Sequence, residues 1–142
     1  MLDEISLKIL KILQEKARIP NIEVARQVEM APSAVLERIR KMERQGIIDG
    51  YEVRLNPEQF DRRQIAFLEI HTRSVGDRPQ TGQDLAAFPE VQEVHYVAGA
   101  DCYLIKLRVA DTNELAAIVR ENIAVINEVV STRTTTVLQT YK

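Results

Sequence analysis

The sequence predicts an α+β protein: an N-terminal (winged) helix-turn-helix domain, followed by a ferredoxin-like βαββαβ domain with a four-stranded antiparallel sheet. Two observations lead to this prediction. Apolar residues recur at the helical period up to about residue 45, and further along stretches of period two alternate with two helical stretches. We expect a helix-turn-helix DNA-binding domain over 1–50, a connecting strand and linker over 51–63, and the ferredoxin-like domain over 64–142.

Three helices are expected in the first domain. The first follows Asp3, whose side chain suits an N-cap. The second starts after the break at Pro20, and the third starts at Pro32, because proline is favoured in a first helical turn. The third helix should end near Gln45, where Gly46 suits the residue that terminates a helix. Three helices joined by short connections are typical of a helix-turn-helix unit.

The segment after the third helix changes to period two. Asp49 and Gly50 have turn chemistry, and the residues over 51–55 form an extended stretch that ends before Asn56 and Pro57. This pattern predicts a small wing or a connecting strand, with the domain boundary near residues 56–63.

The second domain is expected to contain four strands and two helices. Strands are predicted over 65–73, 91–98, 102–109 and 129–138, and helices over 81–88 and from 111 or 112 to about 126. The order βαββαβ places both helices on one face of the sheet.

The opposite face of the sheet is left uncovered. On it we expect Phe67, Glu69, His95, Val97, Leu104, Lys106, Arg108, Arg133 and Val137. A mixed apolar and charged face on so small a domain favours contact with another subunit. A solvated face is the alternative, which antiparallel sheets tolerate.

The third helix carries the candidate DNA-binding residues. Val35, Ile39 and Met42 form one apolar stripe. The remaining face comprises Ser33, Ala34, Glu37, Arg38, Arg40, Lys41 and Arg44. As a recognition helix, it would enter the groove through its small first residues and contact phosphates or guanine edges through Arg40, Lys41 and Arg44. The alternative is a solvated helix face with pairs such as Glu37–Lys41.

Composition limits the other functions. Apolar residues make up 45% and charged residues 28% of the 142 residues, as in folded soluble proteins. The net charge is −2, and neither half is basic, so any contact with nucleic acid must come from a local patch. Apolar runs are too short for a membrane span, and the first residues are acidic, unlike a secretory signal. We therefore expect a cytoplasmic protein.

Catalysis and metal binding find little support. The lone Cys102 cannot form an intrachain disulfide, no His/Cys cluster has metal-ligand spacing, and no phosphate-binding loop or catalytic motif is present. A Cys102–His95 pair is conceivable. A small strand residue and a polar sheet residue explain the two side chains more simply. We expect neither an enzyme nor a metal or other cofactor.

The turn at Gly99, Ala100 and Asp101 is a candidate ligand site. A glycine lets a backbone approach a ligand closely, and exposed amides beside an Asp can hold a zwitterionic amino acid. An ordinary hairpin turn is the alternative.

Two segments of the chain resemble the Lrp/AsnC (feast/famine) family of prokaryotic transcription regulators. The first is LDEISLKILKILQEKARIPNIEVARQV, which runs into PSAVLERIRKMERQGIIDGYEVRLNP. The second is FPEVQEVHYVAGADCYLIKLRV, followed by the Thr-rich VVSTRTTTVLQ. The resemblance covers nearly the whole chain, and ERIRKMERQGIIDGY is its most specific part.

The resemblance implies a DNA-binding head joined by a strand to a regulatory amino-acid-binding (RAM) domain. In such regulators, RAM sheets pair into dimers, and dimers assemble further into octamers or related forms. It also implies that a small effector, usually an amino acid, binds between RAM domains near Gly99, Ala100, Asp101, Cys102 and Tyr103. Such an effector would change assembly or DNA affinity by linkage.

Three departures from the family pattern are present, one of which is Leu7, an apolar residue off the buried face of the first helix, where polar residues are common. The recognition helix usually follows a glycine-containing turn and a serine cap, where this chain has Glu29 and Ala31. In the effector loop, the usual Asp position is occupied by Cys102, with Asp101 one place earlier.

The predicted function is therefore a sequence-specific regulator that binds double-stranded DNA, with a small effector and a homo-oligomeric assembly. The alternative is a ligand-sensing or assembly module that docks protein partners without specific DNA binding. Salt dependence distinguishes the two, because phosphate contacts make DNA affinity fall steeply with salt.

Overall fold

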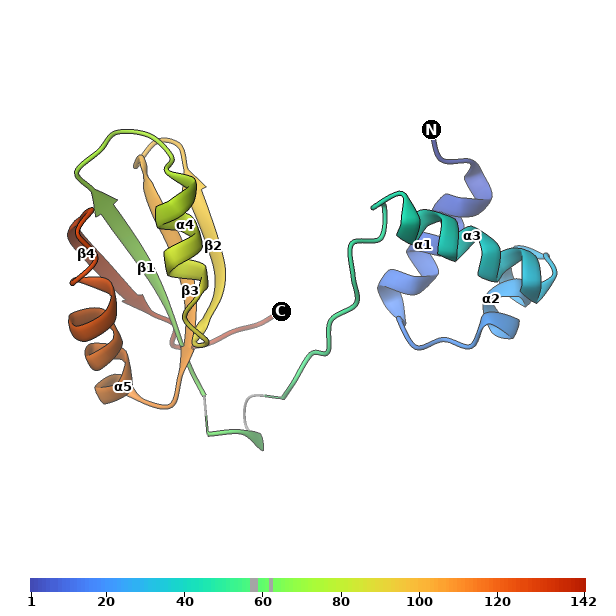
Figure 1. Cartoon of the computed structure of the whole chain (residues 1–142). Coiled ribbons are helices and arrows are strands. Elements are labelled where there is room, and N and C mark those ends of the chain that lie inside the picture. The colour runs from blue at the N-terminus through green and yellow to red at the C-terminus, as the bar shows by residue number, and fades with distance from the viewer. Residues whose placement is uncertain (57–58, 62) are drawn as a thin grey trace. The chain divides into compact units, whose positions relative to one another are not determined.

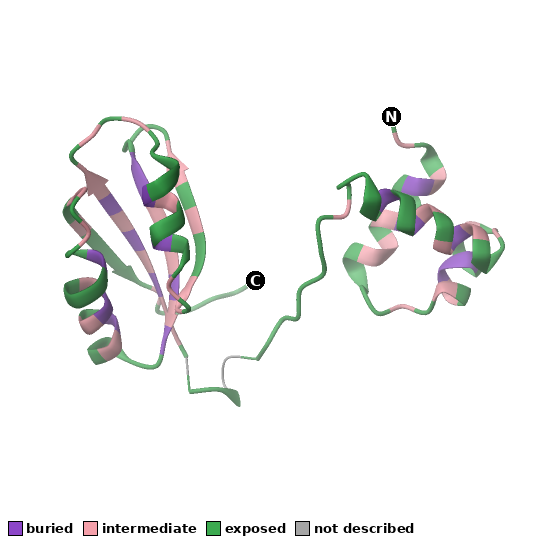
Figure 2. Cartoon of the chain, viewed as in Figure 1, coloured by how far each residue is buried: buried purple, intermediate pink, exposed green. Residues whose placement is uncertain are grey.

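The computed structural model describes residues 1–56, 59–61 and 63–142. The chain divides into two compact units, Met1–Arg54 and Leu55–Lys142. Each unit has its own hydrophobic core, and Figure 2 shows buried residues within both units.

The first unit contains the three expected helices: α1 (Glu4–Glu15), α2 (Asn21–Val28) and α3 (Pro32–Arg44). Asp3 is the N-cap of α1, since one of its carboxylate oxygens accepts the Ser6 backbone N–H at 2.8 Å. The three helices enclose a core of Ile9, Val24, Ala25, Val35, Ile39 and Met42. The apolar stripe predicted on the third helix is therefore the face that α3 buries.

The end of α3 follows the expected glycine motif. Gly46 has φ +69°, and its N–H donates to the Glu43 carbonyl at 3.0 Å. The Ile47 N–H donates to the Met42 carbonyl at 2.9 Å, so the two bonds form a Schellman motif. This motif satisfies carbonyls at the end of the helix and turns the chain away from it.

The strand expected over 51–55 is not formed. These residues pair with no strand in the part of the chain that the structure describes. Tyr51, Val53 and Leu55 expose 52%, 85% and 60% of their surface. The alternation of the sequence suits a strand, but a strand also needs a neighbour for its backbone hydrogen bonds, and this unit supplies helices instead.

The second unit is a four-stranded antiparallel sheet with helices on one face (Figure 1). Its elements are β1 (Gln64–Thr72), α4 (Pro79–Ala86), β2 (Val91–Val97), β3 (Cys102–Val109), α5 (Thr112–Ala117), the π-helix η2 (Ile118–Ile123) and β4 (Val129–Thr136). The strand order β2-β3-β1-β4 is that of the predicted ferredoxin-like fold.

Two helix predictions need correction. α4 begins at Pro79 rather than at residue 81, because proline without an N–H fits the first turn. The last helix is not a single α-helix: after Ala117 the chain continues as a π-helix, and the Ala124 N–H donates to the Val119 carbonyl five residues earlier at 2.8 Å.

The two faces of the sheet differ as expected. Alternate residues of β1 and β3 form the core beneath the helices: Ala66, Leu68, Ile70, Tyr103, Ile105, Leu107 and Val109. On the other face, Phe67 lies opposite Lys106, His95 opposite Leu104, and Glu69 opposite Arg133. The register places the predicted mixed apolar and charged residues together on the face without helices.

Candidate functional site

The exposed face of α3 is the first candidate site. Ser33, Glu37, Arg40, Lys41 and Arg44 are exposed, and Ala34 and Arg38 are half-buried. Five of the seven residues predicted for DNA contact are therefore open to solvent, and the other two are partly covered. These residues differ in the hydrogen bonds and ion pairs that they form within the first unit.

Arg38 binds within the first unit. Its Nη1 donates to Asp3 Oδ2 at 2.6 Å and to the Ser6 hydroxyl at 3.0 Å. The Arg38 guanidinium, followed by the bonds with Ser6, holds the pKa of the Asp3 carboxyl well below its usual range. Arg38 therefore connects α3 to the N-terminal end of α1, a role that its sequence position did not reveal.

Arg44 is also paired, whereas Arg40 and Lys41 are not. Arg44 donates to the Glu37 carboxylate at 2.9 Å, so the Glu37–Lys41 pair of the alternative interpretation does not form. Within the described residues, Arg40 and Lys41 have no ion pair or side-chain hydrogen bond. These two cations are free to meet an anion in solution.

The turn between α2 and α3 has unusual chemistry. Glu29 adopts a left-handed conformation, with φ 56° and ψ 46°, and its backbone N–H donates to the Ala25 carbonyl. Such a conformation normally favours glycine, because a Cβ atom makes it costly. Ala31, at the N-cap of α3, has no side chain that can accept a hydrogen bond. The turn therefore keeps the helix-turn-helix geometry without the glycine and serine expected there.

The predicted effector residues at the start of β3 divide into two groups. Gly99, Ala100 and Asp101 form an exposed turn, in which Gly99 has φ +87° and Asp101 has φ 49°. Cys102 and Tyr103 are each only 1% exposed. Since successive strand residues point to opposite faces, Cys102 lies on the face without helices and Tyr103 lies beneath α4.

The Tyr103 hydroxyl holds the loop before α4. It accepts the Arg78 N–H at 2.6 Å and lies 2.9 Å from both Asp77 Oδ1 and the Arg78 carbonyl oxygen. Burial, opposed by the Arg78 bond and reinforced by Asp77, raises the pKa of this phenol. Tyr103 thus connects strand β3 to the first residues of α4.

Cys102 and His95 do not form a catalytic pair. Burial, together with nearby Glu69 and Asp101, raises the pKa of the Cys102 thiol and so keeps it protonated. The His95 imidazole instead lies 3.2 Å from the Glu93 carboxylate. Because a protonated thiol without a neighbouring base is a poor nucleophile, these residues support the structural interpretation.

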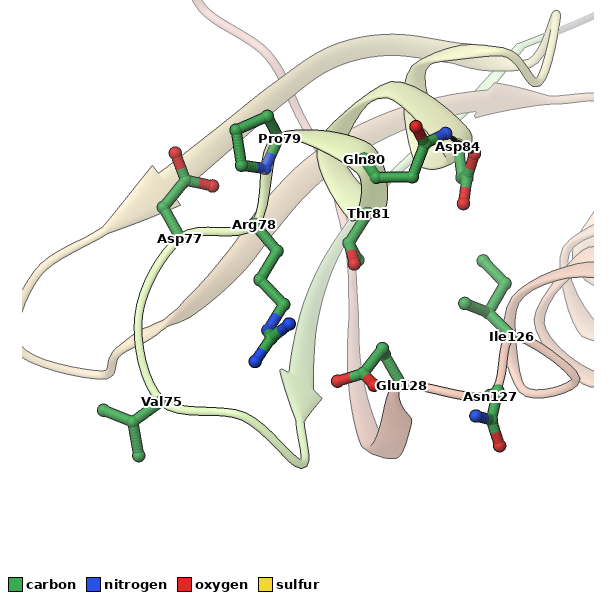
Figure 3. A pocket seen from close by; sticks show the side chains of 10 residues that line it. All are labelled: Val75, Asp77, Arg78, Pro79, Gln80, Thr81, Asp84, Ile126, Asn127 and Glu128. Carbon is green, nitrogen blue, oxygen red and sulfur yellow. Dashed lines mark hydrogen bonds between the residues drawn. The ribbon is translucent and has the colours of Figure 1, made fainter.

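A cavity of about 580 Å³ lies at the beginning of α4 (Figure 3). Its walls come from residues 75–84 and 126–128. Sequence reasoning missed this cavity, because its two segments are far apart in the chain and neither carries a recognisable motif. Only the packing of the two loops brings them together.

The sequence matches two family profiles, one in each unit. Residues 65–142 match the Lrp/AsnC ligand binding domain, and residues 2–49 match a winged helix-turn-helix DNA-binding profile. The chain belongs to the Lrp/AsnC family. Members of the Lrp/AsnC family are DNA-binding transcription regulators rather than enzymes, so the predicted family, fold class and broad function are confirmed.

Relatives and solved structures resemble the chain over nearly its full length. The leucine-responsive regulatory proteins of Haemophilus influenzae and Escherichia coli K12 are 36% and 37% identical, over 99% of this chain and 86% and 87% of theirs. A transcriptional regulator of Neisseria meningitidis, solved as a complex with L-Met, has a TM-score of 0.91 at 28% identity, covering 100% of this chain and 93% of its own. E. coli AsnC has a TM-score of 0.87 at 30% identity, covering 99% and 94%.

Two further observations bear on other functions. Among the described residues, no helix is long and apolar enough to cross a membrane. In the same residues, no group of three or more His, Cys, Asp or Glu side chains is arranged to hold a metal ion.

Proposed function

We propose that this Lrp/AsnC regulator binds specific double-stranded DNA through α3 and changes its affinity or assembly when a small amino acid binds. The observation that carries the DNA proposal is the pair of unpartnered cations, Arg40 and Lys41, on the exposed face of a helix-turn-helix. Side chains of this type bind phosphates and guanine edges, and the small Ser33 and half-buried Ala34 allow the start of α3 to approach the bases.

The ion pairs of α3 support a smaller set of proposed DNA contacts. We propose Arg40 and Lys41 as the primary contacts, because Arg44 and Glu37 form an ion pair that must open before Arg44 can reach a phosphate. Arg38 acts by holding α3 against α1 rather than by contacting DNA. A protein that binds DNA in this way acts where the DNA is, so we place it in the cytoplasm.

The second part of the proposal concerns assembly. The sheet face without helices carries half-buried Phe67 and Leu104 beside charged residues. The unpaired segment 51–55 also exposes apolar side chains. A second copy of the chain would cover the sheet face and offer the segment a strand partner. We propose a homodimer that associates further into an octamer or a related form.

The third part concerns the effector. The match of residues 65–142 to a ligand binding domain and the L-Met complex of the Neisseria relative favour an amino acid. The exposed Gly99–Asp101 turn offers backbone groups for such a ligand, whereas Cys102 and Tyr103 contribute from buried positions. We propose no metal or other cofactor.

The proposal is tested by fluorescence anisotropy with DNA from upstream of the protein's own gene, at two salt concentrations, with and without pooled amino acids. We expect binding that is tighter than to random DNA, weakens steeply with salt and changes with the pool. Binding equal to that of random DNA would contradict the specific interaction. Tight binding unchanged by the pool would contradict the effector part alone.

A further inference from the structure

The cavity at the beginning of α4 is built within a single chain. Its volume of about 580 Å³ lies in the range of small-molecule sites. It is distinct from the Gly99–Asp101 turn, since none of those three residues lines it.

Thr81 supplies a polar group directed into this cavity. The residue is only 5% exposed, and in the described part of the chain its hydroxyl has no hydrogen-bond partner. Among the described residues, no side-chain oxygen or nitrogen is both fully buried and without a hydrogen-bond partner. The Thr81 hydroxyl therefore reaches the cavity, and Figure 3 shows it pointing into the space between Arg78 and Glu128. Such a group is suited to a ligand because it gains a bond that the protein does not provide.

One side of the cavity suits a carboxylate. Arg78 is the N-cap of α4, and no side chain caps the first turn. The backbone N–H groups of Gln80 and Thr81, together with the positive end of the helix dipole, therefore face an anion favourably. The Arg78 guanidinium extends into the same cavity (Figure 3).

Glu128 suits an ammonium group. Its carboxylate lines the same cavity (Figure 3), and one of its oxygens accepts the Ser74 hydroxyl at 3.1 Å. The remaining carboxylate oxygen can accept a hydrogen bond from a cation. Ile126 adds an apolar wall beside these charges. An anion site and a cation site in one small cavity match a zwitterion.

We propose that this cavity binds a free L-α-amino acid, with its carboxylate at Thr81, Arg78 and the first turn of α4 and its ammonium at Glu128. Ile126 would contact an aliphatic side chain. This inference rests on the proposed effector response and gives it a site within each chain, in addition to the turn between β2 and β3.

Tyr103 connects this cavity to that turn. The β1–α4 loop, the β2–β3 turn and the segment before β4 lie at the same end of the sheet (Figure 1). The Tyr103 hydroxyl contacts Asp77 and Arg78 at the cavity wall, while its backbone lies two residues after Asp101. A ligand that fixes Arg78 would therefore also restrain the start of β3, which couples the cavity to the turn.

Isothermal titration calorimetry on the full chain tests the proposal. Each standard L-α-amino acid is titrated singly, and the tightest binder is then compared with its N-acetyl and its amide derivatives. We expect each derivative to bind at least about tenfold more weakly, since each removes one of the two charges. Equal binding of either derivative would overturn zwitterion recognition.

Variants locate the site. Thr81→Val keeps the buried volume but removes the hydroxyl, and Glu128→Gln removes the charge; each should weaken binding about tenfold. Thr81→Ser, which keeps the hydroxyl, and Glu121→Gln, on an exposed residue outside the cavity, should bind like the parent chain. Circular dichroism checks that each variant is folded.

The outcomes separate this inference from the proposed function. Parent-like binding by folded Thr81→Val and Glu128→Gln, with binding lost in a turn variant such as Asp101→Asn, would overturn the cavity site and leave the effector response intact. A parent chain that binds no amino acid would overturn both, and the anisotropy assay would still report DNA binding on its own.

Discussion

Arg38 and Asp3 are 35 residues apart in the sequence, yet Arg38 Nη1 lies 2.6 Å from Asp3 Oδ2. The same Asp3 side chain caps the first turn of α1 through Ser6. One carboxylate therefore starts the first helix and fixes the third helix against it. The orientation of α3 depends on this contact as well as on the apolar core of Ile9, Val35 and Met42.

Replacing Arg38 should destabilise the first unit, Met1–Arg54, in a pH-dependent manner. The folded pKa of Asp3 is depressed, so its contribution to stability is present above the unfolded pKa of about 3.9 and is lost as pH falls through the folded value. We expect Arg38→Gln to lower the midpoint of urea unfolding at pH 7. The midpoints of variant and parent chain should converge below pH 4, and a constant difference down to pH 2 would contradict this linkage.

Replacing Glu29 with glycine should stabilise the protein. Glu29 has φ 56°, a conformation that glycine adopts without a Cβ penalty. We expect Glu29→Gly to raise the free energy of unfolding by about 0.5–1 kcal/mol, measured by chemical denaturation. Glu29→Ala is the matched control, because it removes the same side chain but keeps Cβ. A gain with alanine equal to that with glycine would show that the backbone is not the cause.

A serine at position 31 should add a missing cap. Ala31 occupies the N-cap of α3 without a side-chain acceptor. We expect Ala31→Ser to increase the free energy of unfolding by about 1 kcal/mol, because its hydroxyl can accept a first-turn N–H. Ala31→Val, which adds bulk but no acceptor at that position, should give no gain, and equal stabilisation by valine would refute the capping explanation.

Tyr103→Phe should loosen the loop before α4. The substitution leaves the Arg78 N–H without its 2.6 Å partner, which costs about 1–2 kcal/mol of unfolding free energy. Tyr96, whose ring contacts that of Tyr103 edge-on with centroids 5.1 Å apart, provides the control. Tyr96→Phe keeps this ring contact and should change stability little, so equal effects of the two substitutions would argue against the hydrogen bond.

A charge on the sheet face without helices should disrupt assembly. Leu104 is half-buried there and lies opposite His95 and Glu69. We expect Leu104→Asp to yield smaller species than the parent chain in sedimentation velocity, since an unpaired charge would be buried at the proposed interface. Glu121→Gln on the exposed side of η2 should sediment like the parent. An unchanged assembly with Leu104→Asp would place the interface elsewhere.

Much of the fold could be predicted from the hydrophobic periodicity and from the residues that begin or end helices. The buried stripe of Val35, Ile39 and Met42 and the alternation along β3 were predictable, because burial imposes a period of 3.6 on a helix and of two on a strand. Gly46 marked the end of α3 for a similarly local reason. The stretch over 51–55 has the same alternation, but the described residues 1–56, 59–61 and 63–142 supply no partner strand for it, and periodicity carries no information about partners.

The sites were less predictable because they depend on tertiary contacts. The helical period of α3 grouped Arg38 with Arg40 and Lys41, but it could not show that Arg38 forms a hydrogen bond with Asp3. The cavity beside Thr81 arises only when segments 75–84 and 126–128 pack together. No local pattern marks either event, since the partners are separated by tens of residues.

The salt dependence of DNA binding by variants of α3 tests the central claim most directly. Arg40→Ala combined with Lys41→Ala should lower affinity for the upstream DNA, and should reduce the slope of log affinity against log salt by about 0.9 for each lost phosphate contact. Lys8→Ala, which removes an exposed cation of α1 that pairs with Glu4, is the matched control and should retain the parent slope. Parent-like affinity and slope in the double variant would contradict DNA binding through α3.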